Sequence, residues 1–243
     1  MAETVRLGAL AGEHGSSPSL TAYLSYPDGE GPWPGVVVIH EAFGLTDVMR
    51  RATDRVAALG YLAMAPDLFS RGSMPRCIVA TFRALSAGEG DAFADLAAAR
   101  AALLADERCT GKVGVLGFCL GGGFALVLAN QGYAASAVNY GRLPADLDTA
   151  LDQACPMIGS YGGRDRSLTG VADTLRDTLQ RKGVPHDVKE YPEAGHSFLS
   201  DAADAPWFIR PVSKAILHAG PEPASAADAW DRIGAFFGEH LAG

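Results

Sequence analysis

The chain has 243 residues, of which 48% are hydrophobic and 20% charged, the composition of a globular protein with a sizeable core. Its formal net charge of −8 argues against a nucleic-acid partner, because phosphate binding requires a basic surface. The opening residues lack the basic and apolar regions of a signal peptide, and no apolar run is long enough to span a bilayer. We therefore expect one cytoplasmic domain over residues 1–243, without a membrane partner.

The predicted elements begin with a strand at the edge of a sheet. Residues 19–27 alternate between apolar and polar, which predicts a half-solvated strand in an antiparallel edge hairpin, and the turn-forming residues 28–35 end it. Short unbroken apolar runs follow, and such runs are typical of parallel strands covered on both faces. These strands are expected at 35–40, 61–67, 112–118, 136–141 and 156–163, with a more polar strand at 186–192.

Helical periodicity separates these strands and predicts the helices that cover the sheet. The repeated alternation of strand and helix predicts an α/β fold, a mostly parallel sheet with helices on both faces. Two segments, 70–90 and 200–224, do not fit this pattern and are expected to be inserts that shape a functional site. The helices are expected at 47–59, 91–105, 119–130, 168–182 and 226–241.

The four cysteines are widely spaced and form neither a CxxC pair nor a Cys/His cluster, so the sequence predicts no disulfide framework, no metal site and no cofactor. Cys77, Cys109 and Cys155 are expected to be small, partly buried hydrophobes. Free thiols agree with a reducing, cytoplasmic compartment. Cys119 differs from the other three because of the residues around it.

Cys119 lies between two glycines where the strand at 112–118 leads into the helix at 119–130. The pattern G-x-C-x-G at this junction is the nucleophile elbow of α/β-hydrolases, with cysteine in place of serine. A side chain at Gly117 or Gly121 would collide with the neighbouring strand or helix. The positive end of the helix dipole favours a thiolate at such a turn. A phosphate-binding loop is the alternative, but neither GxGxxG nor GxxxxGK[ST] occurs in the chain.

A nucleophile elbow requires an acid and a histidine later in the chain, each after a strand. Asp165 follows the strand at 156–163, and His196 follows the strand at 186–192. Each residue alone would be an ordinary loop residue. In this order and context they predict a triad with Cys119 as the nucleophile, His196 as the general base and Asp165 as the residue that orients His196.

Two backbone N–H groups are expected to form an oxyanion hole. One belongs to Leu120, and the other belongs to Ala42 in the loop that follows the strand at 35–40. Glu41 lies in the same loop, and a carboxylate near an apolar site requires a partner. Two partners are open: an arginine, in an ion pair, or the sulfur of Cys119 in the resting enzyme.

Four short motifs stand in order along the chain: HEAFG at 40–44, GFCLGG at 117–122, GGRDRSL at 162–168 and AGHSF at 194–198. Together they resemble the dienelactone hydrolase family, from about Ser19 to His240. The resemblance implies an α/β-hydrolase fold and a triad of Cys119, His196 and Asp165 that cleaves ester or lactone bonds. It also implies that Glu41 keeps the resting thiol neutral and takes its proton when substrate arrives.

The substrate region departs from the family pattern. Dienelactone-cleaving members have an arginine four residues after the triad histidine that helps to bind the substrate carboxylate, whereas this chain has Ser200. Unless Arg71, Arg210 or another arginine of the insert at 70–90 reaches the pocket, we expect a preference for uncharged esters or lactones. The candidate substrate contacts are Phe43, Arg76, Arg83 and Ser200.

Other functions are open at this point. The same triad would serve a general carboxylesterase or thioesterase, and a hydrolase scaffold can also become a binding protein without turnover. A thiol redox protein would need Cys77 or Cys155 beside Cys119 as a resolving cysteine. The expected partner is a small-molecule ester or lactone, and the expected assembly is a monomer or a homodimer.

Overall fold

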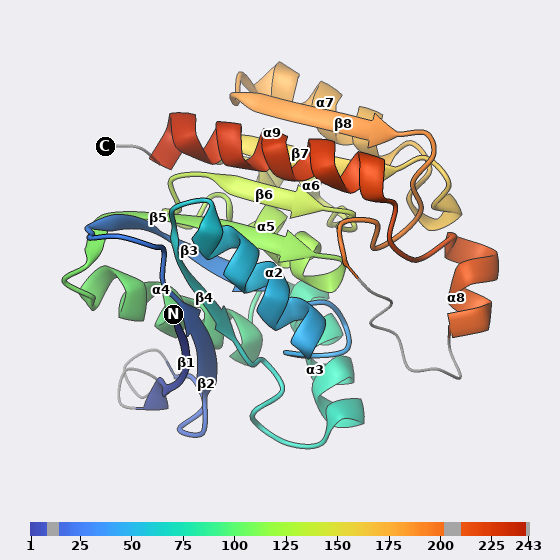
Figure 1. Ribbon diagram of the computed structural model, residues 1–243. Helices are drawn as coiled ribbons and strands as arrows, with labels where there is room; N and C mark the ends of the chain where they lie inside the picture. The colour runs from blue at the N-terminus through green and yellow to red at the C-terminus, as the bar shows by residue number, and fades with distance from the viewer. Residues whose placement is uncertain (9–14, 202–209, 242–243) are drawn as a thin grey trace.

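The computed structural model describes residues 1–8, 15–201 and 210–241. The described residues form one sheet of eight strands in the order β1-β2-β4-β3-β5-β6-β7-β8 (Figure 1). β2 is antiparallel to β1 and β4, and all other neighbours are parallel. The strands are β1 Ala2–Arg6, β2 Thr21–Ser25, β3 Trp33–Ile39, β4 Leu62–Pro66, β5 Cys109–Phe118, β6 Ser136–Asn139, β7 Met157–Gly162 and β8 His186–Tyr191.

Helices cover both faces of the sheet, as expected from the alternation of elements. In Figure 1, α2 and α9 lie in front of the sheet, and α4, α5 and α7 lie behind it. The helices are α2 Asp47–Ala58, α3 Met74–Ala87, α4 Asp91–Ala105, α5 Leu120–Leu128, α6 Leu147–Ala150, α7 Val171–Lys182, α8 Arg210–Leu217 and α9 Pro223–Leu241, with a 3-10 turn, η1, at Arg166–Leu168. Within the described ranges, none of these helices has the length and apolar character needed to cross a membrane.

The structure differs from the expected elements at both inserts and at the sheet edge. The insert at 70–90 contains α3, which begins with a proline in its first turn and ends at Gly88 in the left-handed conformation. The insert at 200–224 contains α8, and its residues 202–209 lie outside the described part. β1 was not expected because four of its five residues are exposed, so it pairs with β2 through its backbone without an apolar pattern.

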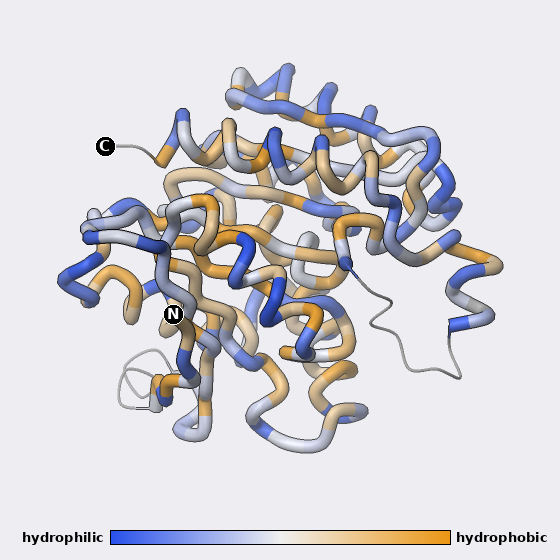
Figure 2. The backbone as a smooth tube through the Cα atoms, in the orientation of Figure 1, coloured by the Kyte–Doolittle hydropathy of each residue, from blue (hydrophilic) through white to orange (hydrophobic). Residues whose placement is uncertain are grey.

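The core lies along the central strands. Figure 2 shows apolar residues in the middle of the sheet and polar residues on the outer sides of the helices. The side chains of Val36 to Ile39 on β3 are fully buried. Unbroken apolar runs therefore mark strands that helices cover on both faces.

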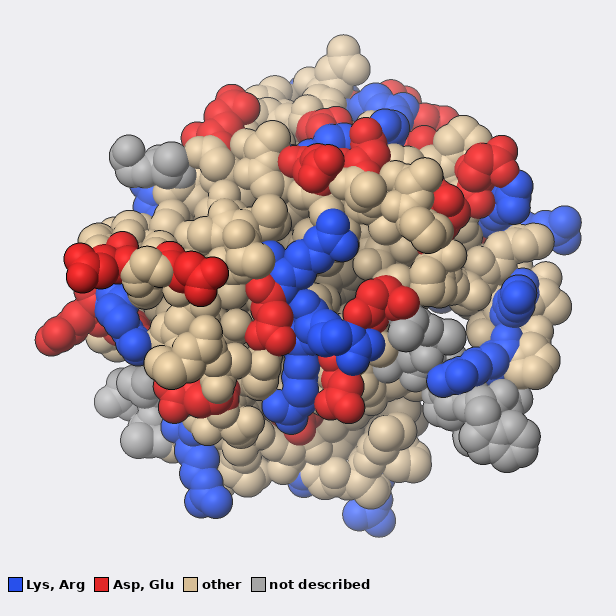
Figure 3. Space-filling view, in the orientation of Figure 1, with Lys and Arg blue, Asp and Glu red and all other residues tan. Residues whose placement is uncertain are grey.

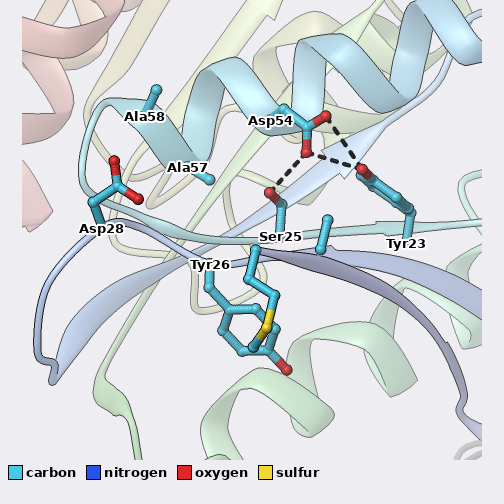
Figure 4. Close-up of a pocket in the computed structure, with 9 residues that line it drawn as sticks. Tyr23, Ser25, Tyr26, Asp28, Asp54, Ala57 and Ala58 are labelled. Atoms are coloured by element: carbon cyan, nitrogen blue, oxygen red, sulfur yellow. Dashed lines mark hydrogen bonds between the residues drawn. The ribbon is translucent and has the colours of Figure 1, made fainter.

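Helix α2 is fastened to the antiparallel edge through Asp54. Its carboxylate accepts hydrogen bonds from the hydroxyls of Ser25 (2.8 Å) and Tyr23 (3.0 Å) on β2 (Figure 4). These residues line an open hollow of about 350 Å³ between β2 and the helix. These hydrogen bonds hold α2 over the antiparallel edge of the sheet.

The surface carries both signs of charge, and Figure 3 shows Lys and Arg side chains interspersed with Asp and Glu. Arg51 on α2 binds both carboxylate oxygens of Asp201, with N···O distances of 2.5 and 2.8 Å. Both side chains are about half exposed, so the pair adds little free energy on its own. It joins α2 to the segment that follows β8.

Helix α5 begins in direct contact with the sheet. A Cβ atom at Gly121 would overlap the carbonyl oxygen of Ile39 at the end of β3, and one at Gly122 would lie 2.6 Å from the carbonyl oxygen of Asn139 at the end of β6. Both obstacles are backbone atoms, so a side chain at either position requires the helix to move. Glycine is therefore what allows α5 to start at this depth.

We predict that Gly121→Ala lowers the free energy of unfolding by about 3 kcal/mol, because the added methyl group displaces α5 from β3. Gly72→Ala is the matched control, since no atom lies within 4 Å of its added Cβ, and it should change stability by less than about 0.5 kcal/mol. Urea denaturation of the two variants measures the difference. Equal stabilities would contradict this account of the packing.

Candidate active site

Cys119 lies at the sharp turn between β5 and α5. Its φ of 53° and ψ of −112° are strained for a residue with a side chain. The turn is held on both sides: the Cys119 N–H donates to the carbonyl of Asn139 (3.0 Å), and the Cys119 carbonyl accepts from Gly123 (3.2 Å). A Cβ at Gly117 would overlap the carbonyl of Gly121, so the expected need for glycine on both sides of the cysteine is confirmed.

His196 and Asp165 are in direct contact. Nδ1 of His196 lies 2.5 Å from Oδ2 of Asp165. The other carboxylate oxygen accepts from the backbone N–H (3.0 Å) and the hydroxyl (2.7 Å) of Ser167 in η1. The Asp165 side chain is fully buried and that of His196 is 13% exposed. The carboxylate is thus fixed by three hydrogen bonds and holds the imidazole in one orientation.

The charges of these groups are coupled. Burial disfavours the imidazolium form of His196, but its electrostatic interaction with the Cys119 sulfur and its hydrogen bonds with Asp165 and Cys119 outweigh burial and raise the pKa to about 10. Burial also disfavours the Asp165 carboxylate, yet hydrogen bonds from His196 and Ser167 keep its pKa below the ordinary value. Because Nδ1 faces Asp165, Nε2 is the nitrogen available to the sulfur. The fold thus brings Cys119, His196 and Asp165 together in this order.

His40 fixes the loop that contains Glu41 and Ala42. Nε2 of His40 accepts the N–H of Leu68 (3.2 Å), so Nδ1 carries the proton and donates to the Glu41 carbonyl (2.7 Å). Burial lowers the pKa of His40 and keeps its ring neutral. The ring therefore links the backbone at Glu41 to the backbone at Leu68 and restrains the loop.

The N–H groups of Ala42 and Leu120 belong to two parts of the chain that meet in the fold, the loop after β3 and the start of α5. Leu120 is the first residue of α5, and Ala42 follows β3, whose terminal carbonyl faces Gly121 of that helix. Within the described ranges, neither N–H donates to a backbone or side-chain acceptor. Their role as an oxyanion hole stays a prediction.

Glu41 is buried, with 2% exposure, and faces Ser200. The hydroxyl of Ser200 donates to Oε1 of Glu41 over 3.4 Å. Tyr140, after β6, is 1% exposed and interacts with both Glu41 and Ser200. Burial and the charge of Glu41 raise the pKa of Tyr140 well above its ordinary value, and Cys119 contributes in the same direction. The loops after β3, β6 and β8 thus meet near Cys119.

Sequence reasoning did not identify Tyr140. The available signal was its place at the carboxyl end of the apolar run at 136–141, the edge of the sheet where the other candidates lie. The two partners considered for Glu41, an arginine and the Cys119 sulfur, both remain predictions. Ser200 is a partner that neither alternative included.

The candidate arginines of the insert lie on α3 or in the loop directly before it. Arg71 binds the buried carboxylate of Asp95 (2.8 Å), which makes it part of the α3–α4 packing. Arg76 lines a hollow of about 200 Å³ between α3 and α4, and Arg83 lines an open hollow on the outer side of α3. Neither hollow contains Cys119. Phe43 is half buried in the loop after β3, and Arg210 begins α8. A role of these residues in substrate binding remains a prediction.

The other cysteines are placed for packing. All four are free thiols. Cys77 is buried and its thiol faces the carbonyl of Phe69 (3.5 Å). Cys155 precedes β7 at the amino end of the strands, across the sheet from Cys119, and burial raises its pKa to about 12. A resolving cysteine at position 155 is therefore excluded. In the part of the chain that the structure describes, no three His, Cys, Asp or Glu side chains form a group that could hold a metal ion.

The eight-stranded, mostly parallel sheet with a sharp strand-to-helix turn at Cys119 defines the class of α/β hydrolases. Residues 20–241 match the model of the dienelactone hydrolase family. The chain belongs to this family, so the resemblance seen in its motifs is confirmed. Membership makes it a hydrolase of ester or lactone bonds.

Known relatives extend over most of the chain. Two bacterial proteins, each named "Putative carboxymethylenebutenolidase", are 30% identical to it. The one from Methylorubrum extorquens aligns over 239 residues, which are 91% of this chain and 77% of that protein. The one from Escherichia coli K12 aligns over 241 residues, which are 91% of this chain and 83% of that protein.

Solved structures share the fold. The crystal structure of a "Putative Dienelactone Hydrolase" from Klebsiella pneumoniae has a TM-score of 0.76 and 25% identity, with 98% of each chain covered. The thermophilic esterase Est2 of Thermogutta terrifontis has a TM-score of 0.60 and 15% identity, with 92% of this chain and 91% of that chain covered. The second likeness concerns the fold alone.

We predict that Asp165→Asn lowers the pKa of His196 from about 10 toward its ordinary value of 6.5, because an amide cannot stabilise the imidazolium form. Titration of the ring by NMR measures this change. Since the folded pKa lies above the unfolded one, the stabilisation is complete below pH 6.5 and is lost as the pH rises through about 10. The variant should therefore lose more stability relative to wild type at pH 6 than at pH 10. An unchanged titration curve would contradict the role of Asp165.

Proposed function

We propose that this hydrolase cleaves its ester or lactone by covalent catalysis, with Cys119 as the nucleophile and His196 and Asp165 as the other members of the triad. The observation that carries the proposal is the strained turn that presents Cys119 to His196, which in turn is held by Asp165. This arrangement meets the geometric requirement for an activated nucleophile and its oriented base.

The reaction then has two steps. In acylation, Glu41 accepts the thiol proton and the sulfur attacks the carbonyl carbon, while the N–H groups of Ala42 and Leu120 bind the developing oxyanion. His196 protonates the leaving oxygen, and a thioester on Cys119 remains. In deacylation, the neutral His196 takes a proton from water, which attacks the thioester and releases the acid; the C–S bond breaks, and Glu41 returns its proton to the departing sulfur. Amides, whose leaving groups are poor, should react slowly.

We predict that Cys119→Ala abolishes hydrolysis of a chromogenic acetate ester, by at least about 1,000-fold in kcat, and leaves the melting temperature within about 2 °C of wild type. The half-buried sulfur fills little space, so its loss makes only a small cavity. The matched control is Cys109→Ala, a half-buried thiol at the opposite end of β5, which should keep wild-type turnover. Turnover by Cys119→Ala at the wild-type rate would refute the proposed nucleophile.

The substrate is expected to be uncharged near Ser200. A substrate carboxylate there would meet a neutral hydroxyl and the buried side chain of Glu41 instead of a cation. We predict that kcat/KM for a neutral lactone exceeds that for its carboxylated analogue by about tenfold or more.

Ser200→Arg should narrow this difference, whereas Ser86→Arg, which adds the same side chain at an exposed position on α3, should leave it unchanged. Steady-state kinetics with the two lactones gives the comparison for all three proteins. A wild-type preference for the carboxylated lactone would show that another cation binds it.

A further inference from the structure

Tyr140 combines two unfavourable features. Its backbone has a φ of 41°, which is rare for a residue with a bulky side chain. Its hydroxyl is buried and forms no regular hydrogen bond within the described part of the chain. Strained backbone and unsatisfied buried polar groups both cost stability, and in native proteins they concentrate at functional sites.

The position of Tyr140 is fixed by its surroundings. Its N–H donates to the carbonyl of Ser160 on β7 (2.8 Å). The next residue, Gly141, packs against the backbone of Gly122 in α5, where a Cβ atom would overlap it. These contacts hold the tyrosine at the carboxyl end of β6, directly beside the start of the helix that carries Cys119.

The ring of Tyr140 extends from this position into the candidate active site. Its centroid lies 5.1 Å from that of His196 and 5.8 Å from that of Phe198. The polar groups around its hydroxyl are the Glu41 carboxylate, the Ser200 hydroxyl and the Cys119 sulfur. The hydroxyl is therefore a donor next to a buried carboxylate that also accepts a long hydrogen bond, 3.4 Å, from Ser200.

We propose that Tyr140 is a positioning residue: with Ser200, its hydroxyl holds the Glu41 carboxylate in the orientation from which it accepts the thiol proton of Cys119. This inference rests on the proposed function, in which Cys119 attacks and Glu41 is the acceptor. The Tyr140 hydroxyl interacts with both Glu41 and Ser200, and the Ser200 hydroxyl donates to Glu41. Two hydroxyl donors then orient one buried carboxylate.

During acylation the thiol proton of Cys119 moves to Glu41. The S–H bond of Cys119 breaks, an O–H bond forms on Glu41, and the electron pair stays on sulfur to form the C–S bond of the thioester. The carboxylic acid of Glu41 then donates to the Ser200 hydroxyl, which can rotate to accept. In deacylation, water and His196 break the thioester, and Glu41 returns its proton to the sulfur only after the C–S bond has broken. The orientation of Glu41, and with it Tyr140, should therefore affect the rate of acylation.

The test compares Tyr140→Phe with Tyr161→Phe. Tyr161, on β7, is also 1% exposed and also has a buried hydroxyl without a regular hydrogen bond, but burial is the cause of its raised pKa and neither Glu41 nor Cys119 contributes. Both changes keep the ring and remove only a buried hydroxyl, so both variants should fold as the wild type does. Burst kinetics with a chromogenic acetate ester gives the acylation and deacylation rate constants separately.

We expect Tyr140→Phe to slow acylation about tenfold, the size expected for a hydrogen bond to a charged group, with KM for the ester and the deacylation rate within about twofold of wild type. Tyr161→Phe should leave both rates unchanged. In a Glu41→Gln background, which is itself slow in acylation, Tyr140→Phe should add less than about a twofold loss, because its effect passes through Glu41.

Three results would overturn the inference: wild-type acylation by Tyr140→Phe, equal losses in acylation and deacylation, or a tenfold loss that persists in the Glu41→Gln background. If Glu41→Gln slows acylation and Tyr140→Phe does not, this inference fails and the proposed function stands. If Glu41→Gln acylates at the wild-type rate, the proposed proton acceptor is wrong and the inference fails with it.

Discussion

The close approach of helix α5 to the ends of β3 and β6 is the contact on which the rest of the site depends. Gly121 and Gly122 allow backbone to meet backbone there, and no other residue type fits without moving the helix. The turn before the helix is correspondingly tight, which strains Cys119 and exposes its side chain at the edge of the sheet. The same approach brings the first N–H of the helix toward the loop after β3.

The remaining groups reach Cys119 because parallel strands end at one edge. Glu41 follows β3, Tyr140 follows β6, Asp165 follows β7 and His196 follows β8. Each loop is held by its own contacts, such as the His40 ring for Glu41 and the Ser167 donors for Asp165. The site is therefore assembled from positions that the scaffold holds. Its pKa shifts follow from the burial of Asp165 beside His196 and of Glu41 beside Tyr140.

The sequence predicts most of this arrangement, because its strongest signals are steric and local. Glycines at 117 and 121 mark the turn, and the order of cysteine, aspartate and histidine after successive strands follows from the fold class. β1 and α3 could not be predicted in the same way. β1 pairs through its backbone and has no buried apolar face, and several large apolar side chains of α3 are exposed. The place of Tyr140 and the ion pair of Arg71 depend on tertiary contacts that no local pattern encodes.

The central claim is that Cys119 forms a covalent acyl intermediate. The most direct measurement is mass spectrometry of wild-type protein quenched with acid during turnover of an activated acetate ester, followed by peptide mapping. The account predicts an added acetyl group on the peptide that contains Cys119, and its disappearance when substrate is exhausted. An acetyl group on a different residue, or continued turnover without any adduct on Cys119, would contradict it.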